Sequence, residues 1–182
     1  MRKKEQWKIE YLRDHVAYEL EMMRHSYDRM VEAEDQSDRN SFFEAFAIHA
    51  RNLYWFLRNN SEHNYYKASD FAKNYRRPNP DKVKGIADKI SKQVAHISSQ
   101  RTIDEENKIN FSNAKEIADW IDHYVFVFAS KLDDCFVPHF NPGKHFYKPS
   151  RPGTTASSAT NAITTTSAVI GDTKFTFDTR RN

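Results

Sequence analysis

The chain has 182 residues, which is enough for one domain at the usual size of about 100–200 residues. Its 38% hydrophobic and 29% charged residues are typical of a globular protein, and a net charge of +3 is too small to imply nucleic acid by itself. A single cysteine, Cys135, excludes an internal disulfide and a cysteine-rich metal site, and it fits a reducing cytoplasm. The longest apolar run, at residues 125–129, is far too short for a membrane span, so we expect a cytoplasmic protein with no membrane contact.

Glycine and proline are scarce in the first 135 residues, because three of the four glycines and four of the six prolines come later. Long segments without a helix breaker favour long helices. The first helix is predicted over residues 5–34, where apolar residues recur at steps of three and four and form one stripe. The stripe consists of Ile9, Leu12, Val16, Leu20, Met23, Tyr27 and Met30.

The second helix is predicted over residues 41–58, with Ser41 and Glu44 as a capping box, although the helix could start a few residues earlier. It carries two apolar stripes and is therefore expected at the centre of the fold. The first stripe contains Phe43, Ala47, Ala50, Tyr54 and Leu57, and the second contains Phe42, Phe46, Leu53 and Phe56.

Two more long helices and one short helix follow. The third long helix is predicted over residues 80–98, with Asn79 as its cap. A shorter helix is expected before it, at residues 68–75. The fourth long helix is predicted to open at Asn113, with an inward stripe that reaches Leu132.

These elements predict an all-α fold, an antiparallel four-helix bundle with one short extra helix over residues 1–136. Residues 137–182 are expected to form a separate tail, first an extended segment rich in proline and aromatic residues and then a stretch rich in serine and threonine. A strand-like pattern near the end of the tail would need a partner edge, so the tail is expected to contact another chain if it is ordered.

His49 and Arg51 interrupt the apolar surface of the central helix, and they are the first candidate site residues. His49 lies on the stripe of Phe42 and Phe46, so its ring is expected to face other helices and to need a polar partner there. Arg51 lies about 200° around the helix and is expected to reach a different neighbour. A structural histidine with an ion-paired arginine and a pair of site residues are both open interpretations.

A resemblance to a known sequence pattern adds further residues to the candidate site. The chain contains HARNLYWF, then KASDFA, then VAHISSQR. It resembles a bacterial family of helical proteins that has the pattern H-x-R-x-L-x-x-F, D-F and H-[IL]-[ST]-x-x-R and no established activity. The resemblance implies that two His/Arg pairs converge on one polar cluster with an acidic residue nearby, whereas capping the third helix is the alternative role of the last pair. The matching residues are His49, Arg51, Leu53, Phe56, Asp70, Phe71, His96 and Arg101, and the polar ones among them, His49, Arg51, Asp70, His96 and Arg101, are the candidate site residues.

The segment RNNSEHNY, at residues 58–65, resembles the R-N-x-x-x-H signature of HEPN-superfamily ribonucleases, including the trailing H-x-Y. In that superfamily a helical bundle dimerises and brings paired Arg and His residues together at a cleft. The resemblance implies a homodimer that cleaves RNA without a metal or cofactor. His63 would act as general base on the ribose 2′-hydroxyl, and Arg58 would stabilise the charged phosphorane. A solvated loop is the alternative interpretation.

Positive charge clusters around one predicted connection between helices, at Lys73, Arg76, Arg77, Lys82 and Lys84. A solvated linker or a surface for RNA phosphates would both explain this run. We therefore carry two hypotheses. The first is a HEPN-like RNA-acting protein, a metal-independent endoribonuclease or an RNA-binding protein of the toxin or anti-phage defence type. The second is a non-catalytic interaction or structural module whose buried His/Arg network fixes the helix packing.

Asp119 and His123 stand four residues apart on the fourth predicted helix, a spacing that two metal ligands could use. The chain offers no second matching pair, so a surface ion pair is the expected role of Asp119 and His123. No glycine-rich phosphate loop, serine nucleophile elbow or cysteine pair occurs. The sequence therefore predicts neither a metal nor a cofactor.

Overall fold

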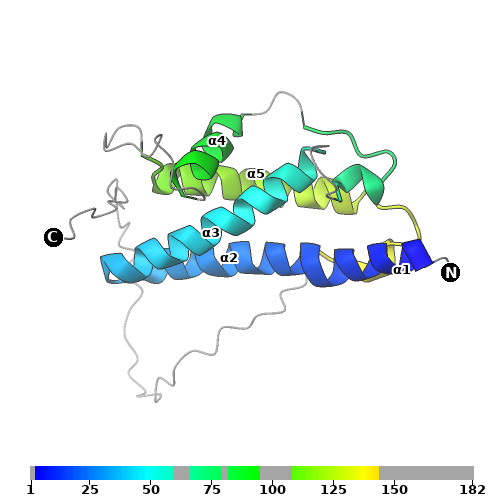
Figure 1. The fold of residues 1–182 in the computed structure, drawn as a ribbon, viewed down its shortest axis with the longest axis horizontal. Helices are drawn as coiled ribbons and strands as arrows, with labels where there is room; N and C mark the ends of the chain where they lie inside the picture. Colours follow the sequence, from blue (N-terminus) through cyan, green and yellow to red (C-terminus); the bar gives the residue numbers. More distant parts are fainter. Residues whose placement is uncertain (1–2, 60–65, 79–81, 95–107, 144–182) are drawn as a thin grey trace, which may run out of the picture.

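The computed structural model describes residues 3–59, 66–78, 82–94 and 108–143 (Figure 1). Within these ranges every regular element is helical, so the predicted all-α fold is confirmed. The elements are α1 (Lys3–Glu10), the π-helical segment η1 (Tyr11–Val16), α2 (Ala17–Glu32), α3 (Gln36–Leu57), the 3₁₀ turn η2 (Ala68–Asp70), α4 (Lys84–Gln93), α5 (Phe111–Ala129) and the 3₁₀ turn η4 (Val137–His139).

The first three elements form one continuous helix, because Glu10 and Ala17 at their junctions both have helical backbone angles. This confirms the helix predicted from the spacing of its apolar residues. Six of the seven stripe residues are buried, and Tyr27 is half-buried. The π-helical segment was not predicted. Its wider turns insert about one residue into the helix and rotate the following side chains without ending it.

The start of α3 differs from the prediction. Asp35 is the N-cap, and its carboxylate accepts a hydrogen bond from the backbone N–H of Asp38 at 2.9 Å. That bond holds the pKa of the Asp35 carboxyl below its usual range, because accepting a backbone N–H favours the charged form. Ser41, the predicted cap, lies inside the helix and donates its hydroxyl to the carbonyl of Ser37. The helix therefore begins five residues earlier than the capping box indicated.

The two apolar stripes make α3 the central helix, as predicted. All five residues of the first stripe are buried, and in the second only Phe42 is half-buried, beneath the guanidinium of Arg29. In Figure 1 the chain runs along α1 and α2 and returns along α3, which lies between α2 and the pair formed by α4 and α5. This arrangement is compatible with the predicted antiparallel bundle.

The helices after α3 are shorter than predicted or begin elsewhere. The short helix predicted at residues 68–75 is only the 3₁₀ turn η2. The next helix starts at Lys84, and Val83 before it has no side-chain capping bond. The predicted cap at Asn79 and the predicted helix end at residues 95–98 lie outside the described residues.

The cap of α5 is Asn110 and not Asn113. The two side chains bond reciprocally, because each amide oxygen accepts the backbone N–H of the other residue at 2.9 and 3.3 Å. Asn113, which was predicted to open the helix, therefore takes part in the capping bonds, but it occupies the third helical position.

The packed chain also continues past residue 136. Phe140 is buried, and its ring lies 5.7 Å from that of Phe128 on α5. Pro142 is also buried. The segment up to residue 143 therefore belongs to the packed structure, whereas the predicted tail from residue 144 onward lies outside the described residues.

Candidate functional site

His49 bridges α3 and α2. Its ring nitrogen Nδ1 lies 2.8 Å from a carboxylate oxygen of Glu19, and the side chain of Asn52 donates to the same oxygen at 3.2 Å. Because a carboxylate only accepts hydrogen bonds, Nδ1 must carry the donated proton. The ring of Tyr18 meets the imidazole edge-on, at 5.6 Å between ring centres. The polar partner that the sequence required for His49 is therefore a carboxylate on the neighbouring helix.

Arg51 points to a different helix, as its position predicted. Its Nε donates to the hydroxyl of Ser91 on α4 at 3.0 Å. Arg51 and Ser91 are both partly buried. Through His49 and Arg51, α3 thus makes one polar contact with α2 and another with α4. Each contact helps to fix the position of the neighbouring helix along α3.

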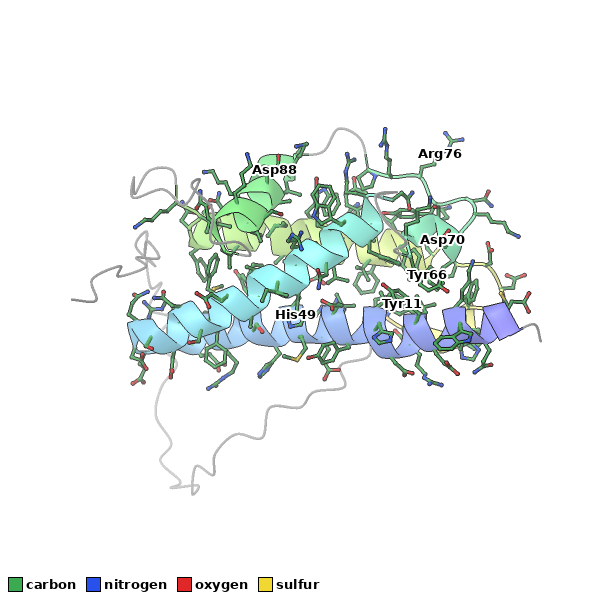
Figure 2. All side chains as sticks on the ribbon, in the orientation of Figure 1. Tyr11, His49, Tyr66, Asp70, Arg76 and Asp88 are labelled. Carbon is green, nitrogen blue, oxygen red and sulfur yellow. The ribbon has the colours of Figure 1, made fainter. Side chains whose placement is uncertain are left out.

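Asp70 does not join this pair. Its carboxylate accepts the backbone N–H of Lys67 at 3.0 Å, and its carbonyl accepts the ammonium of Lys8 at 2.6 Å. Figure 2 shows Asp70 beside Tyr66 and Tyr11, well away from His49. Asp70 therefore bonds within its own turn and to Lys8, whereas convergence of the full set stays a prediction, because His96 and Arg101 lie outside the described residues.

Three candidate residues, His63, His96 and Arg101, lie outside the described residues. Arg58 is described, and its Nη1 donates to the carbonyl of Pro78 at 2.6 Å. Next to it, Asn59 adopts a left-handed backbone with φ of 54°, and its side-chain oxygen accepts the backbone N–H of Ser69 at 2.9 Å. Arg58 and Asn59 tie the end of α3 to the chain that follows.

The five cations predicted to cluster, Lys73, Arg76, Arg77, Lys82 and Lys84, are all exposed. We call these five residues the basic connection. Figure 2 shows Arg76 projecting from the surface beyond Asp70. Two of the five have acidic neighbours among the described residues: Lys73 lies 3.8 Å from Asp133, and Lys84 pairs with Asp88 one turn along α4.

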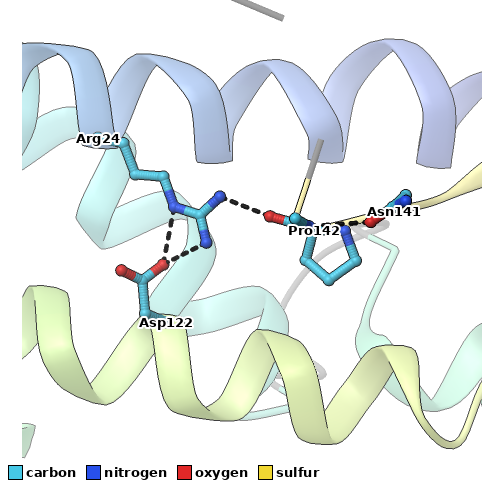
Figure 3. A network of polar contacts seen from close by, with 5 residues as sticks. Arg24, Asp122, Asn141 and Pro142 are labelled. Carbon is cyan, nitrogen blue, oxygen red and sulfur yellow. Dashed lines mark hydrogen bonds and ion pairs between the residues drawn. The ribbon is translucent and has the colours of Figure 1, made fainter. Parts of the chain in front are cut away.

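A pocket of about 420 Å³ opens between α2, α5 and the chain at residues 142–143. Arg24 forms one wall: its Nε and Nη2 donate to a single oxygen of Asp122 at 2.9 and 2.7 Å, and its Nη1 donates to the carbonyl of Pro142 at 2.6 Å (Figure 3). The side-chain oxygen of Asn141 accepts the backbone N–H of Gly143 and shapes the turn there. No motif in the sequence marked this network, because it joins residues about 100 positions apart.

In the described part of the chain, no group of three or more His, Cys, Asp or Glu side chains is placed to bind a metal ion. Asp119 pairs with Lys115 one turn earlier on α5, and the ring of His123 packs edge-on against Tyr124.

None of the helices in the described ranges combines the length and the apolar character needed to cross a bilayer.

The fold and these contacts define an all-α helical-bundle protein. No protein-family model, curated protein or solved structure matches the chain. The likeness to HEPN ribonucleases therefore rests on the motif at residues 58–65 and stays a prediction.

Proposed function

We propose that this protein binds RNA through the basic connection. The observation that carries the proposal is that all five of its cations are exposed on one continuous stretch of chain. Residues 66–94 hold eight Lys or Arg residues and three Asp residues, a net charge of +5 against +3 for the whole chain. The rest of the chain therefore carries a slightly negative net charge, and a polyanion would be attracted to residues 66–94.

Phosphate contacts make binding depend on salt, and this gives a quantitative test. We expect Arg76→Glu with Arg77→Glu to weaken binding of a labelled single-stranded RNA and to flatten the plot of log affinity against log salt. Each lost phosphate contact should change the slope by about 0.7. The measurement is fluorescence anisotropy of the full chain across a range of KCl concentrations.

The matched control reverses two exposed arginines elsewhere, Arg13→Glu with Arg29→Glu, for the same change in net charge. Their side chains are 54% and 47% exposed and lie on η1 and α2. Equal loss of binding in both double variants would mean that only net charge matters, and it would overturn a specific surface. Binding by neither wild type nor control would reject RNA as the ligand.

Endonuclease activity is the sharper form of this proposal. If Arg58 and His63 act as the HEPN-like spacing implies, the wild type cleaves structured RNA in EDTA, and His63→Ala binds RNA with unchanged affinity but no longer cuts it. Equal cleavage by His63→Ala and wild type would remove the nuclease proposal and leave RNA binding standing. The same resemblance predicts a homodimer, which light scattering of the full chain measures directly.

A second candidate function, a non-catalytic module, has its own supporting observation. His49 and Arg51 each bond to a neighbouring helix, which suits a network that fixes helix packing. The two proposals are compatible, because the first uses exposed cations and the second uses partly buried ones. The exposed thiol of Cys135 suits the cytoplasmic location that we propose for both, since no other cysteine is present to pair with it within one chain.

A further inference from the structure

The pocket between α2 and α5 combines an apolar floor with acidic walls. Met23 and Ala118 form the floor and are buried. Phe126, at the edge, is 53% exposed. A ligand that covered Phe126 would remove apolar surface from water.

The charge of the walls is negative. The pocket is lined by Asp28, Asp119 and Asp122 and by one cation, Arg24. Arg24 directs all three of its guanidinium nitrogens at Asp122 and the Pro142 carbonyl, so its charge is already matched. Asp119 pairs with Lys115, which lies outside the lining, so a cationic ligand would share this carboxylate with Lys115. The lining therefore favours a ligand with both cationic and aromatic groups.

The chain itself supplies such a ligand next to the pocket. Gly143 is part of the lining, and one peptide step of about 3.8 Å leads to the next residue. Residues 144–151 read KHFYKPSR, with three Lys or Arg residues, two aromatic residues and no acid. A segment tethered this closely has an effective concentration of about millimolar or more, so even weak contacts would keep it docked.

We propose that residues 144–151 dock into this pocket of the same chain, with their cations toward Asp28 and Asp119 and an aromatic ring over Phe126. The pocket is then an intramolecular acceptor for a basic, aromatic segment. The docked segment covers Phe126 and extends the contact that Arg24 already makes with the Pro142 carbonyl. This inference does not depend on RNA binding.

A photo-crosslink in the full chain tests the proposal. The photoreactive amino acid p-benzoylphenylalanine replaces Phe146, and after brief irradiation mass spectrometry identifies the attached peptide. We expect attachment within one chain to α2 near Asp28 or to α5 near Phe126. The same probe at Phe177, far along the tail, should give no defined attachment.

Charge and shape variants decide whether the pocket itself holds the segment. Asp28→Lys with Asp119→Lys should lower the crosslink yield about fivefold, because two exposed ion pairs are lost. Phe126→Ala should lower it as well, whereas Glu44→Lys, an exposed acid on α3, should leave it unchanged. All four positions are at the surface, and melting curves confirm folding. Attachment elsewhere, or a yield that ignores the pocket variants, overturns the proposal, and crosslinked dimers through the same peptides would assign the pocket to a second copy's tail instead.

Discussion

Replacing His49 by alanine tests whether its contact with Glu19 holds α3 to α2. The substitution removes a hydrogen bond of 2.8 Å to a carboxylate and the ring that packs against Tyr18. It leaves Glu19 with the longer contact from Asn52 at 3.2 Å. Because the bond joins two packed helices, its loss should appear directly in the free energy of unfolding.

The size of the effect follows from burial. Hydrogen bonds to charged groups contribute about 1.5–3 kcal/mol. The side chains of His49 and Glu19 are 14% and 26% exposed, so water partly replaces the lost bond and the lower part of that range applies. A loss of about 2 kcal/mol corresponds to a fall of about 4–8 °C in melting temperature for a chain of this length.

A double-mutant cycle isolates the pair from the packing. Thermal or urea unfolding is measured for His49→Ala, Glu19→Gln and the double variant, and we expect a coupling energy of about 1 kcal/mol. His123→Ala, at an exposed histidine on α5, serves as the matched control and should leave the melting temperature within about 1 °C of wild type. Zero coupling with an unchanged melting temperature for His49→Ala would refute the structural role and would make this histidine a candidate for chemistry again.

Two further changes test single contacts. Asp35→Ala removes the observed cap of α3 and should lower the melting temperature by about 2–5 °C, whereas Ser41→Ala should have almost no effect; the reverse result, read by circular dichroism, would restore the predicted cap. Tyr75→Phe removes a buried hydroxyl that has no hydrogen-bond partner among the described residues, so urea unfolding at neutral pH should show a gain of about 1 kcal/mol, and a loss would contradict this reasoning. Burial also raises the pKa of Tyr75 above its ordinary 10.0, so the wild type should lose stability as the pH rises above 10, where the unfolded chain ionises first, and Tyr75→Phe should lose less.

Apolar spacing predicted the helices because it is a local property, and it failed where the choice was between similar polar residues. Residues 35–41 form one polar stretch, and spacing alone favoured Ser41 as the cap. In the structure the helix extends back to Gln36, because local side-chain hydrogen bonds stabilise its first turn. The side chain of Gln36 donates to that of Asn40, and Arg39 donates to the carbonyl of Ala33. The helix was predictable from the core face, whereas its first turn depended on side-chain bonds that spacing does not reveal.

The candidate site shows the same division. The cost of burying an imidazole required a polar partner for His49, and the angle around the helix required a different one for Arg51. The partners themselves, Glu19 and Ser91, stand 30 and 40 residues away, and only the register between packed helices selects them. Convergence with Asp70 was inferred from a sequence pattern and had no such physical basis, and the structure places Asp70 in its own turn.

The two proposed surfaces share no residue, and this separation provides a cross-check. The basic connection runs from the chain after α3 to the first residue of α4, whereas the pocket is lined by α2, α5 and residues 142–143. Charge reversal at Arg76 and Arg77 should therefore weaken RNA binding and leave the crosslink from position 146 intact. Phe126→Ala should lower that crosslink and leave RNA affinity unchanged, since it alters no charge. A single variant that changed both measurements would indicate a disturbed fold, because no residue of the basic connection lines the pocket.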